Sequence, residues 1–268
     1  MSTQKRPTKI ESRKNEKVRL FLKLAESKKA RNQRNLCVLE GLRLAVDAFH
    51  FGVRFHQLLL SEPVFRKLEH DKPQLLSSCR SCLCLIDEKV ASEISSVVAN
   101  QGVFAIVEKP KNHKLSSFES NQNILILVEL SNPGNIGALI RSAVAFGFRT
   151  IVLANCCDVC NTKVVRSSMG AIFKAKISEC SVAELKNWLQ QTKLTTIAAV
   201  LNSSEIQEIN NIKNCALLIG NEANGLTSEI INLCKVRTSI VMQNQIESLN
   251  ASIAGSVLMF ALSREINF

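Results

Sequence analysis

The second half of the chain alternates short apolar runs with amphipathic stretches, and this alternation constrains the fold more than any other feature. Residues 123–130 (NILILVEL) form a continuous apolar run, which is typical of a strand buried on both faces of a sheet. Residues 136–147 (IGALIRSAVAFG) have helical spacing, and residues 150–155 (TIVLAN) predict the next strand. Together they predict a βαβ unit of about thirty residues and therefore a parallel α/β sheet.

Further elements extend this pattern to the end of the chain. Additional strands are predicted at 196–201, 216–220 and 238–242, and helical stretches begin near Val182, Thr227 and Ser248. The polar, Pro110-containing segment before this half predicts a linker at 109–122.

The first half is less regular. Residues 5–35 predict a basic helical segment with a narrow apolar stripe formed by Leu20, Phe21 and Leu24. Residues 37–52 predict a helix, and strands are predicted at 55–61 and 102–108. The apolar face expected for that helix consists of Leu39, Leu42, Val46 and Phe49.

Positive charge is concentrated at the start of the chain. The net charge is +11 over 268 residues, and residues 1–36 alone carry 12 Lys/Arg against 3 Asp/Glu. Such a cluster is typical of a surface that binds a polyanion, and we expect that polyanion to be RNA. No apolar run approaches the roughly 20 residues of a membrane helix, and the first ten residues do not resemble a secretory signal. The sequence therefore predicts a soluble cytoplasmic protein with no membrane partner.

Ten cysteines could form disulfides, bind zinc or pack in the core. Without a secretory signal, a disulfide framework is not expected. The two Cys-x-x-Cys pairs, Cys79 with Cys82 and Cys157 with Cys160, lie much further apart than the roughly 15–20 residues typical of zinc sites. We therefore predict no metal site. Four other cysteines lie in apolar segments and are interpreted as small core residues: Cys37, Cys180, Cys215 and Cys234.

The second half also lacks the side chains that serve most catalytic mechanisms. The chain has no tyrosine, its last histidine is His113, and Asp158 is the only aspartate after Ser120. An active site in this half would therefore have no histidine base, no Ser-His-Asp triad and no pair of aspartates for a metal ion.

Three polar loops follow predicted strands of the parallel sheet. Ligands of open parallel sheets bind beyond the carboxyl ends of the strands, and this rule selects residues 131–137, 220–225 and 243–250. The first loop lacks the Gly-x-Gly-x-x-Gly fingerprint of dinucleotide sites, and the chain has no Gly-Lys-Ser/Thr of a P-loop. A methyl-donor site or another adenosine site remains open.

These loops carry three signatures that together resemble the SpoU/TrmH group of the SPOUT RNA methyltransferases. The signatures are NPGNIGALIRSA from Asn132, LIGNEANGL from Leu218 and IVMQNQIESLNASIA from Ile240. Their order and spacing also match, and the resemblance spans about 120–268. The first half is more weakly similar to the family's substrate-binding domain, through the segments EGLR at Glu40 and QGV at Gln101.

The resemblance implies 2′-O-ribose methylation of RNA, ribosomal RNA before transfer RNA, with S-adenosylmethionine as methyl donor. It also implies a deep trefoil knot in an α/β SPOUT domain, a small ribosomal-protein-like α/β domain before it, and a homodimer with the active site near its interface. Size and layout are similar to those of thiostrepton-resistance rRNA methyltransferases. The expected organisation is a basic helical segment (1–36), an RNA substrate-binding domain (37–108), a linker (109–122) and a SPOUT methyltransferase domain (123–268).

Carried over by position, the resemblance assigns three groups of site residues. The catalytic group is Asn135, Arg141, Glu222, Ser248 and Asn250. The donor-binding group is Leu218, Gly220, Ile240, Met242 and Leu249. Arg166, within VVRSSMG, is expected near donor and RNA. The family's Ile-Pro-Met is Ile240-Val241-Met242 here, and because valine restores an N–H and frees φ, we expect a modest effect on donor affinity.

Arg141 has two possible roles. The family proposal makes it a general base, but a guanidinium in a protein is essentially always protonated. We favour a clamp that holds an RNA phosphate and stabilises the developing alkoxide, and the sequence leaves both roles open. Two rival functions fit these residues less well. The presence of Asn135, Arg141 and Asn250 disfavours a non-catalytic RNA-binding or ribosome-assembly protein, and the Ser248-Leu249-Asn250 signature disfavours methylation of a base nitrogen.

Overall fold

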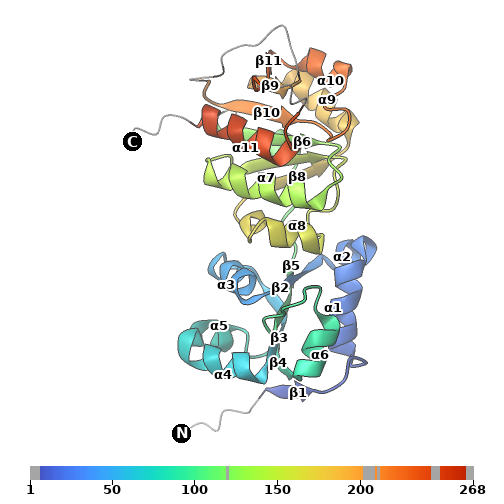
Figure 1. The fold of residues 1–268 in the computed structure, drawn as a ribbon, viewed down its shortest axis with the longest axis vertical. Coiled ribbons are helices and arrows are strands. Elements are labelled where there is room, and N and C mark those ends of the chain that lie inside the picture. Colours follow the sequence, from blue (N-terminus) through green and yellow to red (C-terminus); the bar gives the residue numbers. More distant parts are fainter. Residues whose placement is uncertain (1–6, 119–120, 202–208, 210–211, 243–247, 264–268) are drawn as a thin grey trace. The chain divides into compact units, whose positions relative to one another are not determined.

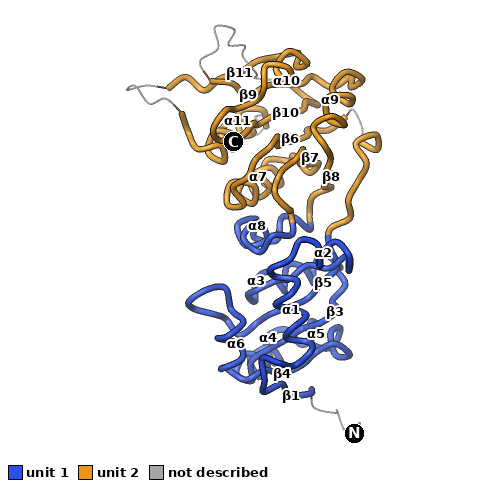
Figure 2. Tube along the Cα trace, turned by 90° about the vertical axis from the view of Figure 1, so that its right-hand side faces the viewer, with its two compact units in different colours: residues 1–109, 160–173 blue, residues 110–159, 174–268 orange. Residues whose placement is uncertain are grey.

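The chain folds into two units (Figures 1 and 2). The computed structural model describes residues 7–118, 121–201, 209, 212–242 and 248–263. Unit 1 comprises residues 1–109 and 160–173, and unit 2 comprises residues 110–159 and 174–268. The chain therefore passes between the units three times. Residues 160–173, which belong to unit 1, lie in sequence between two strands of unit 2. The sequence-based domain boundaries stay predictions.

Unit 1 is built on a mixed five-stranded sheet in the order β1-β4-β3-β5-β2. The β1–β4 and β4–β3 pairs are parallel, whereas β5 runs antiparallel to both β3 and β2. The strands are β1 (Thr8–Ile10), β2 (Leu36–Glu40), β3 (Phe55–Ser61), β4 (Leu83–Ile86) and β5 (Val103–Glu108).

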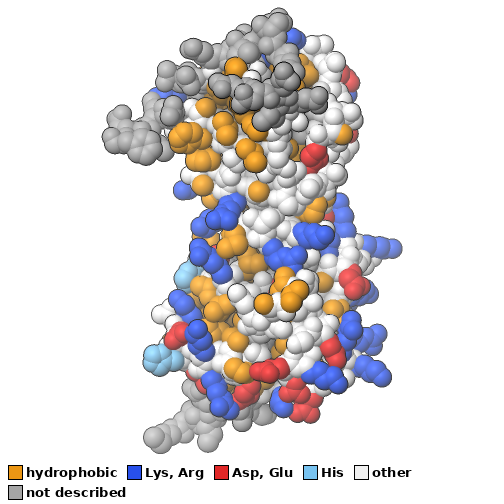
Figure 3. Space-filling model, in the orientation of Figure 1, with side chains coloured by type: hydrophobic (Ala, Val, Ile, Leu, Met, Phe, Trp, Pro, Cys, Tyr) orange, Lys and Arg blue, Asp and Glu red, His pale blue; other side chains and the backbone are white. Residues whose placement is uncertain are grey.

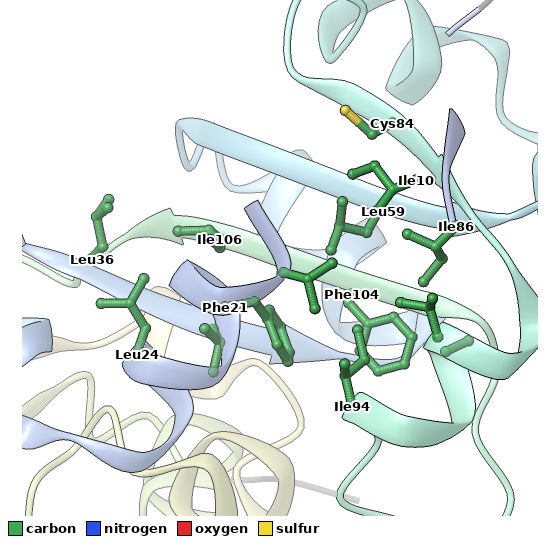
Figure 4. Packing of buried hydrophobic residues seen from close by; sticks show 14 of the residues in the cluster. Ile10, Phe21, Leu24, Leu36, Leu59, Cys84, Ile86, Ile94, Phe104 and Ile106 are labelled. Atoms are coloured by element: carbon green, nitrogen blue, oxygen red, sulfur yellow. The ribbon is translucent and has the colours of Figure 1, made fainter. Parts of the chain in front are cut away.

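Helices cover both faces of this sheet, with α1 and α6 on one face and α3, α4 and α5 on the other (Figure 1). The predicted apolar stripe of α1 is confirmed for Phe21 and Leu24, and Phe21 packs edge to face on Phe104, with ring centroids 5.5 Å apart (Figure 4). The helices are α1 (Glu16–Glu26), α2 (Lys28–Arg34), α3 (Leu42–His50), α4 (Glu62–Asp71), α5 (Pro73–Ser78), α6 (Glu88–Ile94) and α8 (Thr162–Ser167).

The end of α1 depends on a buried arginine. Arg31 of α2 is buried, and its Nη1 donates to the carbonyl oxygens of Leu24 at 2.6 Å and Ala25 at 3.0 Å. The last carbonyls of a helix lack partners within the helix, so this cation provides a partner for two of them. One charge of the basic segment therefore serves the fold.

Two predictions for this half are wrong. Residues 37–40, expected to be helical, belong to β2, and residues 8–10 form β1. A short apolar run shows no periodicity, so periodicity cannot distinguish a buried strand from a segment of buried helix. Gly41, with φ of 110°, then divides β2 from α3. As a result α3 buries Leu44, Ala45 and Ala48 instead of the expected face.

Unit 2 is built on a six-stranded sheet in the order β11-β9-β10-β6-β7-β8, and every pair is parallel. Helices α7 and α11 lie together on one face, and α9 and α10 cover the other (Figures 1 and 2). The strands are β6 (Ile124–Val128), β7 (Thr150–Ala154), β8 (Lys176–Cys180), β9 (Thr195–Ala199), β10 (Cys215–Ile219) and β11 (Val236–Thr238). The helices are α7 (Pro133–Ala145), α9 (Val182–Gln191), α10 (Ser228–Leu233) and α11 (Ala251–Leu262).

The predicted parallel α/β sheet is confirmed, and two strands differ from expectation. Strand β8 has no counterpart in the sequence prediction, and β11 lies at Val236–Thr238 instead of 238–242. Both are edge strands, which have one neighbour and are less completely buried than the central strands. Their sequences therefore lack the continuous apolar run that identifies a central parallel strand. Among the described residues, no helix is long and apolar enough to cross a membrane.

Candidate active site

Three loops of unit 2 leave the carboxyl ends of β6, β10 and β11. Strands β6 and β10 are direct neighbours, with Leu127 opposite Ile219, so the loops that follow them start side by side. The third loop follows β11 and leads to α11, and its residues 243–247 lie outside the described part of the chain. This is the edge at which open parallel sheets bind their ligands.

The side chain of Asn135 joins residues from all three loop regions. Its Nδ2 donates to Oε1 of Glu222 at 3.0 Å, and its Oδ1 accepts from Nδ2 of Asn250 at 3.1 Å. Asn135 is 7% exposed and lies in the first turn of α7. A buried amide with both donor and acceptor satisfied holds its partners in place. The structure thus brings together three of the predicted catalytic residues, which are separated by 87 and 115 positions in sequence.

Asparagines also begin the two helices that start at this site. Oδ1 of Asn132 accepts from the N–H of Gly134 at 2.8 Å and caps α7, with Pro133 at the first helical position. Oδ1 of Asn250 accepts from the N–H of Ser252 at 2.9 Å and caps α11. Asn250 therefore fixes the start of α11 and the amide of Asn135 at the same time.

The loop after β10 folds back on its own first residue. Oδ1 of Asn221 accepts from the N–H of Ala223 at 2.7 Å and of Asn224 at 3.1 Å, which closes the turn. A Cβ at Gly220 would lie 2.2 Å from the carbonyl carbon of Gly225 and 2.3 Å from the nitrogen of Leu226. Since these contacts are with backbone, only glycine fits at position 220.

The predicted donor-binding residues have different environments. Leu218 is fully buried in the core of unit 2, so its side chain belongs to the packing of the sheet. Ile240, Met242 and Leu249 are half-buried, and Val241, at the position of the family proline, is 75% exposed.

The remaining predicted residues do not join the Asn135 cluster through a hydrogen bond or ion pair. Arg141 is exposed near the end of α7, and Ser248 is exposed in the third loop. Neither side chain makes such a contact with another described residue. Arg166 belongs to unit 1, where its Nη1 lies 3.8 Å from the carboxylate of Glu40.

Sequence reasoning did not assign a role to Asn132, Asn221 or Glu129. Asn221 donates through Nδ2 to the carbonyl of Glu129 at 3.3 Å, and Glu129 has a φ of 55° directly after β6. These residues shape the loops. The sequence does carry a signal for them. Each is an asparagine or an acidic residue within a few positions of the end of a buried strand, where side chains commonly hydrogen-bond the backbone.

The cysteine pairs form no metal site within the part of the chain that the structure describes. None of the ten cysteines forms a disulfide there, and no three described His, Cys, Asp or Glu side chains converge as metal ligands. A hydrogen bond from the Cys79 thiol, together with the charge of Lys17, lowers the pKa of Cys82 to about 7. Burial raises the pKa of Cys156 and of Cys215 to about 12, as expected for packed thiols.

Two family models match the chain. The SpoU rRNA Methylase family matches residues 122–260, which contain the whole Asn135 cluster, and the MRM3-like substrate binding domain matches residues 15–105. The chain belongs to the SpoU rRNA methylase family. The resemblance inferred from the three signatures is therefore confirmed.

Named relatives match over most of the chain. The 23S rRNA (guanosine(2553)-2'-O)-methyltransferase RlmP of Bacillus subtilis (strain 168) is 27% identical over 94% of this chain and 98% of its own length. The 23S rRNA (uridine(2479)-2'-O)-methyltransferase of Streptomyces viridochromogenes is 30% identical over 61% of this chain and 60% of its own length. The AdoMet-bound rRNA methyltransferase from Sinorhizobium meliloti matches with a TM-score of 0.85 and 25% identity, over 97% of this chain and 98% of that chain.

The crowding at Gly220 gives a direct test of the loop. We expect Gly220→Ala to lower the free energy of unfolding by about 1–3 kcal/mol, as overpacking does, and to abolish binding of S-adenosylmethionine. Denaturant unfolding and calorimetric titration measure the two effects. Ala223→Ser, at an exposed position of the same loop, should leave both unchanged. Parent-like stability and affinity in Gly220→Ala would show that the loop tolerates a side chain at that position.

Proposed function

We propose that this chain is an S-adenosylmethionine-dependent methyltransferase that modifies ribose 2′-hydroxyl groups of ribosomal RNA. The observation that carries the proposal is the hydrogen-bonded chain Glu222–Asn135–Asn250 in a SpoU-family domain. Relatives named as 23S rRNA 2'-O-methyltransferases support the reaction and the RNA class. A match of residues 15–105 to a substrate-binding domain supports RNA binding by unit 1.

The loops of unit 2 fit a donor that is held largely by backbone groups. Gly220 offers backbone without a side chain, and Ile240, Met242 and Leu249 offer half-buried apolar surface for an adenine ring. Loop carbonyl oxygens suit a positively charged sulfur. When bound, S-adenosylmethionine supplies a methyl group that its sulfonium activates for transfer. We assign the donor site to these four residues, with the backbone of Leu218 beside them.

The acceptor side needs positioning and one positive charge. Methyl transfer requires the nucleophilic oxygen and the methyl carbon to be aligned about 3–3.5 Å apart. In this proposal Asn135, fixed from both sides, orients the ribose, and Ser248 adds a hydroxyl. The exposed guanidinium of Arg141 holds the adjacent phosphate and stabilises the alkoxide as the proton leaves to phosphate or water. Arg166 would contact the RNA from unit 1.

An apolar face of α11 supports a homodimer. The helix buries Gly255, Leu258, Met259 and Leu262 in its own unit but leaves Ile253 53% exposed and Val257 44% exposed. Figure 3 shows hydrophobic side chains gathered on this face of unit 2. An exposed apolar surface of this kind is a usual site of association, and we propose that a second copy covers it.

The acceptor atom can be tested with one RNA change. Once the modified nucleotide is mapped by mass spectrometry, a substrate with a single 2′-deoxy nucleotide there should bind normally and accept no methyl group. Binding should persist because one hydroxyl is a small part of the interface. Methylation of this RNA at the parent rate would place the acceptor on the base and contradict the proposal.

Arg141 should matter for rate and not for donor binding. We expect Arg141→Ala to fold, to bind S-adenosylmethionine like the parent and to lose at least about 100-fold in rate, as for other lost transition-state contacts. Lys186→Ala, at a partly exposed position on the helix that covers the other face, serves as control. Near-parent turnover by Arg141→Ala would remove it from the mechanism.

The association face is tested by introducing charge. Val257→Lys should convert the dimer to a monomer at micromolar concentration, because burying an unpaired ammonium in an apolar interface is unfavourable. Light scattering gives the mass, and Gln190→Lys, at an exposed position of α9 elsewhere on unit 2, controls for the added positive charge. A parent chain that is monomeric and fully active would overturn the dimer.

A further inference from the structure

Unit 1 contains a cavity of about 300 Å³ that is lined only by its own residues. This volume is at the lower end of the roughly 300–1,000 Å³ that small-molecule sites occupy. One set of lining residues is apolar and comes from four elements of the unit: Phe21, Leu22 and Ala25 of α1, Val38 of β2, Ile94 of α6 and Val165 of α8.

A buried carboxylate organises the polar end of this cavity. The side chain of Glu40 is 11% exposed, and its Oε1 accepts from Oγ of Ser95 at 2.5 Å and from the N–H of Ser96 at 3.2 Å. Its Oε2 accepts from Oγ of Ser96 and lies 3.8 Å from Nη1 of Arg166. Arg166 also donates to Oγ of Ser96 through the same Nη1. Glu40 therefore acts as a positioning residue for the Ser95–Ser96 loop and for Arg166.

Arg166 is held in place but retains donors. A guanidinium has five N–H groups, and only Nη1 of Arg166 hydrogen-bonds another described residue. The side chain is 30% exposed and lines the cavity. Its Nε and Nη2 groups can therefore meet a ligand without breaking the contact with Glu40.

Two further carboxylates line the same cavity as acceptors. Glu26 and Glu93 are exposed, and neither makes a hydrogen bond or ion pair with another described residue. Together with Glu40 they outnumber the two lining cations, Arg13 and Arg166. This balance disfavours a phosphate inside the cavity and favours a neutral ligand that offers both acceptors and donors.

We propose that this cavity binds one unpaired guanine base of the RNA substrate. The inference rests on the proposed function and extends it to base recognition by unit 1. Guanine presents O6 and N7 as acceptors, for which an arginine fork is the usual partner, and N1–H and the 2-amino group as donors. Its flat faces suit the apolar walls, and RNA readers commonly take up splayed bases in this way. Exposed Arg13, which lines the same cavity, then meets the flanking phosphate.

The loop beside the cavity has exposed apolar side chains that suit such a contact. Gln101 accepts the N–H of Leu42 through Oε1 at 2.9 Å, and Asn100 accepts the N–H of Gly102 at 3.0 Å, so its polar side chains are used internally. Val97 and Val98 are left exposed, Val98 completely. Exposed apolar side chains on a loop fixed from within provide a surface on which a neighbouring base can lie.

Calorimetric titration with guanosine and uridine 5′-monophosphates tests the cavity in the full chain. The donor site is first saturated with S-adenosylhomocysteine, so that neither nucleotide can enter it. We expect the guanosine nucleotide to bind at least about 10-fold more tightly, because a bidentate base contact discriminates by about 5- to 150-fold. Equal affinities, or no binding of either nucleotide, would overturn the proposal.

Variants link this binding to the cavity. Ala25→Phe adds an aromatic ring to the apolar wall of the cavity. Arg166→Lys keeps the positive charge but removes the planar guanidinium that can donate two parallel hydrogen bonds. Each should weaken guanosine monophosphate binding at least about 10-fold while S-adenosylhomocysteine still binds. Glu108→Gln removes a carboxylate of unit 1 that pairs with Arg54 and His56 outside the cavity, and it should change nothing. If Arg166→Lys binds guanosine monophosphate as tightly as the parent does, the assignment of the cavity is wrong. This test stands even if Ala25→Phe does not fold.

Methylation assays separate the two proposals. With an active parent, Arg166→Lys should raise the KM for RNA at least about 10-fold with little change in kcat, as expected for lost uniform binding. An unchanged KM in this variant would remove the base contact and leave the methyltransferase proposal intact. A parent that binds guanosine monophosphate but methylates no ribosomal RNA would remove the proposed function and leave the cavity as a nucleotide site.

Discussion

The candidate active site of unit 2 depends on one side-chain amide. Asn135 donates to Glu222 and accepts from Asn250, and these two bonds connect loops that follow three different strands. A carboxylate at position 135 could not donate to Glu222, and a hydrophobic residue could neither donate nor accept, whereas an amide carries a donor and an acceptor on one planar group. The parallel sheet brings the loops to the same edge, and the amide fixes their relative positions there. The helices α7 and α11 begin at the same place because Asn132 and Asn250 cap them.

Charge in unit 1 has two different uses. Arg31 is buried and bonds two of the last carbonyls of α1, and Glu40 is mostly buried and holds the Ser95–Ser96 loop. These groups are satisfied within the fold. In Figure 3, other Lys and Arg side chains lie over the surface of unit 1, where they are available to a polyanion. The basic composition of the first 36 residues is therefore only in part a measure of RNA-binding capacity.

The sequence predicted most of unit 2 because its central strands are buried on both faces. Their continuous apolar runs and the polar loops after them located the sheet, its edge and the three signatures. The edge strands β8 and β11 are less covered and carry no such run, so they were missed or displaced. In unit 1 the run Leu36–Leu39 was assigned to a helix, because its length and composition suit either structure.

The signatures assigned the candidate site residues, but their contacts were not predictable from sequence. Spacing could not show that Asn135 is the residue that bonds both Glu222 and Asn250, nor that the backbone crowding Gly220 belongs to its own loop. Arg166 was assigned from the resemblance, whereas its bonds with Glu40 and Ser96 arise because residues 160–173 fold with unit 1. The trefoil knot and the cytoplasmic location stay predictions.

Hydrogen exchange in Asn135→Ala tests the central role of this amide most directly. If Asn135 holds both loops, the amides of Ala223 and Asn224 in one loop and of Ile253 and Ala254 at the start of α11 should all exchange faster than in the parent. Amides of β7, such as those of Val152 and Leu153, should keep their protection because the sheet is unchanged. Faster exchange confined to α7, with both distant segments protected as in the parent, would contradict the account.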